Sequence, residues 1–222
     1  SEIINDFREV IIVANDPIEH LSSDKITKIV DFKKNLGPLG GVFSANAQQT
    51  DEDKLKARLQ TLHNFSASFT QKVTDANHEV LQEATGVIKL KQPNKLYWEL
   101  NPPNENILIA DGNTLWNVDP FVEQVTAISQ DQAVANNPLI LLTQPNSDAW
   151  ENFSVSYTND TFRIDAKNPD SAVHSLVLVF DGAQLTSMSM QDSQQQISDL
   201  YFNDIQQNKT VSDKVFTFSL PD

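Results

Sequence analysis

Short stretches of alternating apolar and polar residues constrain the fold of this chain more than any other feature. A period of two is typical of β-strands that bury one face. Turn-forming residues such as Asp111-Gly112-Asn113 and Asp181-Gly182 separate these stretches, and no long helical pattern lies between them. The pattern therefore predicts an antiparallel sheet large enough to curl. The clearest alternating segments are residues 66–73, 161–166 and 215–220, and residues 176–180 indicate a further strand that is apolar on both faces.

Helical patterns are few and short. Thr50-x-x-Asp53 resembles a capping box, and the stripe of Leu55, Leu59 and Leu62 predicts an amphipathic helix over about residues 51–64. Three shorter helices are expected in the middle of the chain: over 129–136, from Pro138 through Leu142, and after a cap at Ser147 or Asp148. They are too short to form a layer, so we expect a helical lid over one face of the curled sheet.

The first 44 residues differ from the rest. Ile3, Ile4, Phe7, Val10, Ile11 and Val13 stand at helical spacing, residues 26–30 show a second short helical pattern, and a Gly/Pro-rich stretch follows at 37–41. Ala45-Asn46-Ala47 matches the cleavage site of a secretory signal. We interpret residues 1–47 as an N-terminal extension, a signal remnant or a segment foreign to the domain, and residues 48–222 as the functional domain. A segment that docks on the domain is the alternative.

Charge and cysteine content exclude several functions. The net charge is 16 − 30 = −14, and nucleic-acid binding needs a basic face. A chain without cysteine has no thiolate metal site, no cysteine nucleophile and no N-terminal lipid anchor on cysteine. No apolar run approaches the roughly 18 residues of a membrane-spanning helix, so we expect a soluble chain.

The search for catalytic or metal-binding motifs is negative. No two of the four histidines stand at the i, i+4 spacing of a helical metal site, and no phosphate-binding loop or nucleophile elbow is present. We therefore predict no catalytic residue, no metal and no cofactor. A carboxylate pair assembled only by folding stays open, and with it a hydrolase on a β scaffold.

Apolar residues gather on successive strands between residues 90 and 121. They form either an ordinary sandwich core or the partly unfilled face of a curled sheet that accepts an apolar ligand under the lid. On the second interpretation the candidate cavity residues are Phe69, Leu90, Leu96, Trp98, Leu100, Ile107, Ile109, Leu115 and Trp116, with Leu139 and Leu142 on the lid.

Several ordered motifs resemble one known family. They are Phe65-Ser-Ala-Ser-Phe-Thr-Gln-Lys-Val-Thr-Asp75, Pro93-Asn94 with Trp98, Asp111-Gly-Asn-Thr-Leu-Trp116 and Pro120-Phe-Val-Glu-Gln124. Over about residues 51–221 the chain resembles the outer-membrane lipoprotein carrier family LolA; residues 1–44 lie outside the resemblance. The resemblance implies an incomplete antiparallel β-barrel with a helical lid over a hydrophobic cavity for acyl chains.

The resemblance also implies a function and partners. Such carriers work in the periplasm, take acylated lipoproteins from the inner-membrane ABC release complex LolCDE, and pass them to the outer-membrane receptor LolB. They catalyse no reaction, and we expect a monomer. The charge of −14 leads us to expect only transient membrane contact. A receptor of the same fold is an alternative that the missing cysteine disfavours.

One position departs from the family pattern. The family commonly has arginine before the Pro-Asn pair, where it binds lid backbone, and this chain has Gln92. A neutral amide still reaches a carbonyl but lacks the charge-assisted bond. We therefore expect a looser lid at this latch position, unless Lys91 or Lys95 substitutes.

Overall fold

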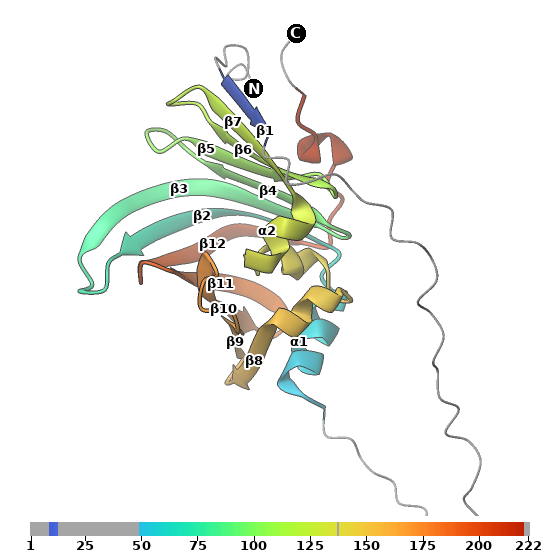
Figure 1. Ribbon diagram of the computed structural model, residues 1–222. Helices are drawn as coiled ribbons and strands as arrows, with labels where there is room; N and C mark the ends of the chain where they lie inside the picture. Colours follow the sequence, from blue (N-terminus) through green and yellow to red (C-terminus); the bar gives the residue numbers. More distant parts are fainter. Residues whose placement is uncertain (1–8, 13–48, 137, 220–222) are drawn as a thin grey trace, which may run out of the picture.

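One curled sheet with most of its short helices on the inner side makes up the domain (Figure 1). The computed structural model describes residues 9–12, 49–136 and 138–219. In this part of the chain no helix is long and apolar enough to cross a membrane. The strands are β1 (Glu9–Ile12), β2 (Asn64–Thr74), β3 (Val80–Lys91), β4 (Lys95–Leu100), β5 (Asn106–Ala110), β6 (Thr114–Asp119), β7 (Gln124–Ser129), β8 (Phe153–Thr158), β9 (Thr161–Ala166), β10 (Val173–Asp181), β11 (Gln184–Asp192) and β12 (Ile197–Gln207).

The strands lie in the order β1-β7-β6-β5-β4-β3-β2-β12-β11-β10-β9-β8. Neighbours along β7 to β2 and along β12 to β8 are mostly joined by hairpins, whereas the pairing of β2 with β12 brings the two ends of the domain together. These pairs are antiparallel. Among the described strands only β1 pairs in parallel, with β7, and it forms the edge of the sheet there. The expected open antiparallel sheet is therefore confirmed.

The helices gather at one end of the sheet (Figure 1). The capping box at Thr50 is confirmed, because its hydroxyl accepts from Asp53 N–H and the Asp53 carboxylate accepts from Thr50 N–H. Ser147 caps the third short helix of the middle region, as expected. The helical elements are α1 (Asp51–Gln60), α2 (Gln130–Asn136) and the 3₁₀ helices η1 (Ile140–Thr143), η2 (Asp148–Asn152) and η3 (Asp213–Phe216).

Three sequence expectations are wrong. The first helix ends at Gln60 instead of near residue 64, because i→i+3 bonds to Arg58 O and Leu59 O tighten the chain before β2. Residues 215–220 were expected to form a strand; instead Phe216 ends η3, which Ser212 caps, and residues 217–219 join no described strand. Residues 9–12 are extended, not helical. The rest of the N-terminal expectations, and Leu220, lie outside the described residues.

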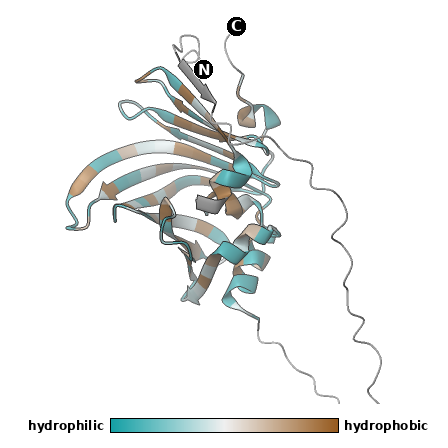
Figure 2. Ribbon diagram, viewed as in Figure 1, coloured by the Kyte–Doolittle hydropathy of each residue, from teal (hydrophilic) through white to brown (hydrophobic). Residues whose placement is uncertain are grey.

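The two faces of the sheet bury different residue sets. Side chains alternate along each strand, so apolar and polar bands alternate along the ribbons in Figure 2. We call the face that packs against α1 and the lid the inner face; its cluster extends from β4 across β3, β2, β12 and β11 to β9. On the opposite, outer face a smaller buried set comprises Ile109, Val118, Val125, Ala127 and Phe216.

Candidate binding site: the apolar inner face and its lid

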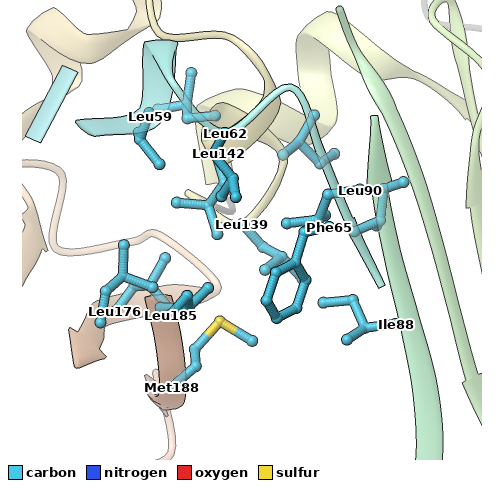
Figure 3. Packing of buried hydrophobic residues seen from close by; sticks show 14 of the residues in the cluster. Leu59, Leu62, Phe65, Ile88, Leu90, Leu139, Leu142, Leu176, Leu185 and Met188 are labelled. Carbon is cyan, nitrogen blue, oxygen red and sulfur yellow. The ribbon is translucent and has the colours of Figure 1, made fainter. Parts of the chain in front are cut away.

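The floor of the site is a row of paired apolar residues on neighbouring strands. Leu90 of β3 pairs with Leu96 of β4, and Ile88 pairs with Trp98. Residues that are direct partners in an antiparallel sheet share a face, so all four point inward. Each is at most 5% exposed. Phe65 of β2 pairs with Leu90 and extends the floor toward the other half of the sheet (Figure 3).

A glycine allows two aromatic rings to lie close together on this floor. Phe69 pairs with Gly86, and its ring centroid lies 4.7 Å from that of Trp98. A Cβ at Gly86 would lie 2.5 Å from Cζ of Phe69 and would overlap the carbonyl oxygen of Glu99. The absence of a side chain at this position therefore shapes the floor under Phe69.

The lid closes the floor with consecutive aliphatic side chains. Leu139, Ile140, Leu141 and Leu142 are at most 3% exposed, which means that no side of this short segment faces water. Figure 3 shows Leu139 and Leu142 directed toward the same interior as residues of α1, β2, β3, β10 and β11. The lid is expected from the sequence, and these contacts show why it is stable: it fills the apolar space that the curled sheet leaves.

Gln92 ties α1 to the sheet. Its Nε2 donates to the carbonyl oxygens of Leu59 at 2.6 Å and Leu62 at 3.0 Å. These carbonyls lie in the last turn of α1 and just after it, where no further helical turn supplies N–H donors. The backbone N–H of Gln92 also donates to His63 O at 2.9 Å. The amide thus reaches carbonyls beside the lid, as the sequence suggested for the latch position.

The two neighbouring lysines are engaged elsewhere. Lys91 Nζ and Lys95 Nζ lie 2.9 Å and 2.7 Å from Asp213 Oδ1, at the start of η3. Hydrogen bonds from Lys95 and then Lys91 lower the pKa of Asp213 to about 2. These charges fasten the C-terminal segment, so the expectation that a lysine substitutes at the latch finds no support in these contacts.

Eight of the predicted cavity residues share the inner side. Leu100 pairs with Gly86, and Leu115 pairs with Ala110, which itself pairs with Leu96. Both leucines are partly buried and pack on the inner cluster. The eight residues are Phe69, Leu90, Leu96, Trp98, Leu100, Leu115, Leu139 and Leu142.

Three predicted cavity residues lie on the outer face instead. Ile109 pairs with Tyr97 and with Trp116, and Ile107 pairs with Glu99, all one residue out of phase with Trp98. Because side chains alternate with a period of two, this one-residue difference turns Ile107, Ile109 and Trp116 away from the lid. Their assignment to the cavity wall together with Trp98 is therefore corrected.

Trp116 has a different role on the outer face. Its Nε1 donates to Asp111 Oδ2 at 2.9 Å, and its ring lies 5.0 Å from that of Phe218. Burial by itself raises the pKa of Asp111, but hydrogen bonds from Thr114 N–H and from Trp116 outweigh it and leave the pKa below its ordinary value. Trp116 thus anchors the C-terminal segment.

The half of the floor formed by β10 and β11 is not among the site residues predicted from the sequence. Leu176 and Leu178 of β10 and Met188 of β11 belong to the same inner cluster as Phe65 and Ile88. Leu178 pairs with Met188, so both point inward. The apolar run of β10 and the alternation of Ser and Met in β11 are usable signals, but only the pairing of β2 with β12 brings these strands next to the predicted residues.

An open depression of about 550 Å³ lies beyond the far end of the floor, and half of its lining, including Thr70, Thr85 and Tyr201, faces the outer side of the sheet. Gln71 and Ala84 pair with each other one inward position beyond Phe69 and Gly86, and both line it. Pro102 and Pro103 of the β4–β5 loop form another part of its wall. The depression is therefore not a continuation of the apolar floor.

The described residues hold no cluster of three or more His, Cys, Asp or Glu side chains that would bind a metal ion. The chemistry that the site offers is apolar contact, with hydrogen bonds at its margin. A curved apolar face, a lid of aliphatic side chains and an amide that ties α1 to the sheet define a lidded half-barrel, a class of protein suited to sheltering an apolar ligand.

The comparisons with known proteins agree with that class. The family model described as outer membrane lipoprotein carrier protein LolA matches residues 60–219. The chain belongs to this family.

Two curated relatives with this name support the same membership. An outer-membrane lipoprotein carrier protein of Idiomarina loihiensis is 34% identical over 194 residues, which cover 87% of this chain and 95% of the relative. One of Aliivibrio fischeri (strain ATCC 700601 / ES114) is 37% identical over 183 residues, 82% of this chain and 91% of the relative. Among solved structures, a LolA superfamily protein from Nitrosomonas europaea is similar with a TM-score of 0.45 and 12% identity, over 75% of this chain and 97% of that one.

Proposed function

We propose that this protein carries acylated lipoproteins through the periplasm and holds their acyl chains between the inner face and the lid. The observation that supports this most is the continuous apolar floor, from Trp98 and Leu96 through Phe65 to Met188, covered by a lid of leucines. The family and the names of the relatives point to the same cargo.

Binding on this floor needs no covalent chemistry. Each buried CH₂ of an acyl chain contributes about 0.8 kcal/mol of binding free energy. Burial of a long acyl chain on the floor can therefore compensate for the burial that the lid leucines lose when they move away. Leu139 and Leu142 then move outward. If α1 moves with them, the hydrogen bonds from Gln92 to Leu59 O and Leu62 O must break. The protein alternates between a closed empty state and an open loaded state.

The proposed cavity comprises the eight inner-side residues, with Gln92 as its latch, in a carrier domain of residues 48–222. Cargo would come from the release complex LolCDE in the inner membrane and leave to the receptor LolB at the outer membrane. Both partners are proposed from the family resemblance. We propose a monomer that touches membranes only transiently and catalyses no reaction.

A matched pair of variants tests this function. Leu100 and Val87 are both partly buried on neighbouring strands but face opposite sides of the sheet. The tagged chain, purified from a periplasm, should retain intact triacylated lipoproteins, detected by mass spectrometry. Leu100→Gln should retain several-fold less than Val87→Gln, with circular dichroism confirming that both fold. Equal retention by the two variants, or turnover of a small substrate by the wild-type chain, would contradict the proposal.

A further inference from the structure

A second side-chain amide, this one buried, lies at the opposite side of the lid from α1. Gln130 is the first residue of α2 and only 2% of it is exposed. Its Oε1 accepts from Gly112 N–H at 3.1 Å, and its Nε2 donates to Asn94 O at 2.8 Å. The start of the lid is thereby tied to two separate turns of the sheet, β5–β6 and β3–β4.

The end of α1 and the lid meet at the β3–β4 turn, residues 92–94. Gln92 holds the end of α1 through Leu59 O and Leu62 O, as described above. Asn94 O is held by Gln130, and Asn94 N–H donates to Thr143 O at the end of η1 at 3.4 Å. One turn of three residues therefore fastens α1, α2 and η1 together.

The same turn is continuous with the floor. Leu90 and Leu96 precede and follow it, pair with each other, and are 3% and 1% exposed on the inner face. A ligand that separates floor from lid presses on these two leucines and so on the turn between them. On each side, only one residue of backbone therefore separates these floor leucines from the turn that holds the latches.

We propose that Gln130 is a second latch of the lid, and that the β3–β4 turn is the hub through which filling of the floor releases both latches. Gln130 is a positioning residue in this scheme, since it acts through Asn94 and not by touching the ligand. The inference rests on the proposed function for its ligand, but the latch itself is a property of the empty protein. All four side-chain hydrogen bonds of Gln92 and Gln130 join neutral groups, so each is weak enough to break on loading.

Amide hydrogen exchange measured by NMR tests the latch without any ligand. Gln130→Leu removes both side-chain bonds at similar volume and should raise the exchange rate of Asn94 N–H about tenfold. Exchange in β10 should stay unchanged. The control is Asn106→Leu, which also loses two side-chain bonds, to Asn117 Oδ1 and Val118 O, at the end of β5 away from the lid. It should leave Asn94 N–H unaffected.

Two results would overturn the latch: no change at Asn94 N–H in Gln130→Leu, or an equal rise throughout β10, which would indicate general loss of stability.

For the hub, palmitate added to the wild-type chain should also raise exchange at Asn94 N–H. Palmitate that binds without this rise overturns the hub. If palmitate does not bind but Gln130→Leu frees Asn94, the latch stands and the proposed carrier function fails.

Discussion

The side-chain amide of Gln92 donates a 2.6 Å hydrogen bond to the carbonyl oxygen of Leu59, the last buried leucine of α1. This single contact joins the β3–β4 turn to the helix that covers the floor. A second bond from the same nitrogen reaches Leu62 O. Because donor and acceptors are neutral, the pair is weaker than the charge-assisted bonds that a guanidinium would make at the same carbonyls.

Replacing Gln92 by arginine should therefore tighten the lid. Gln92→Arg is expected to slow release of a fluorescent acyl probe roughly 3- to 10-fold, because charged donors strengthen such bonds by about 1 kcal/mol. Stopped-flow competition with unlabelled fatty acid measures the rate. Gln92→Leu is the matched control and should release the probe faster than the wild-type chain. Equal release rates for all three proteins would show that this position does not hold the lid.

Gly86→Ala should destabilise the fold. The new Cβ overlaps Glu99 O and crowds the Phe69 ring, so we expect a loss of about 1–3 kcal/mol in the free energy of unfolding. Urea denaturation followed by tryptophan fluorescence measures it. Gly182→Asn is a suitable control, because Gly182 has φ 56° with open space around it and asparagine tolerates that conformation. A Gly86 variant as stable as the control would mean that the floor adjusts freely.

The opposite orientations of two tryptophans predict opposite phenotypes. Trp98→Leu should weaken binding of an acyl probe, since Trp98 lies on the inner face against Phe69. Trp116→Leu should leave probe binding within about twofold but loosen the C-terminal segment, since it removes the contact with Phe218 and the bond to Asp111. Probe titration and limited proteolysis near residue 213 distinguish the two. Loss of probe binding in Trp116→Leu alone would reverse the assignment of faces.

The C-terminal segment should loosen in acid. Hydrogen bonds from Lys95 and Lys91 lower the pKa of Asp213 from 3.8 to about 2. A carboxyl whose pKa is lower in the folded state stabilises it above pH 4, and this contribution disappears as the pH falls toward 2. The stability difference between the wild-type chain and Asp213→Asn, from urea unfolding at pH 5, 3 and 2, should therefore shrink with pH.

The same difference should also shrink with added salt, because Asp213 is largely exposed. Asp170→Asn, a change at an exposed acid of the β9–β10 loop, serves as the control. A difference between wild type and Asp213→Asn that is constant from pH 5 to pH 2 would contradict the role of this ion pair.

Local patterns predicted much of the architecture. The capping box at Thr50, the period-two strands and the short lid helices all follow from interactions between residues close in the chain. The prediction for residues 215–220 is wrong for an instructive reason: alternation also arises where a 3₁₀ turn and the residues after it lay Phe216 and Phe218 on a neighbouring surface without strand pairing. Alternation thus reports one-sided burial, and a strand is only its commonest cause.

The sequence by itself determined that this chain forms a curled antiparallel sheet with a helical lid, and the family motifs in it indicated an acyl-chain carrier. It also determined which residues of each strand share a side, because the period of two is a property of the backbone. Only the tertiary structure decided which side faces the lid. That choice depends on the register of distant strands: a shift of one residue separates Trp98, which faces the lid, from Trp116, which faces away.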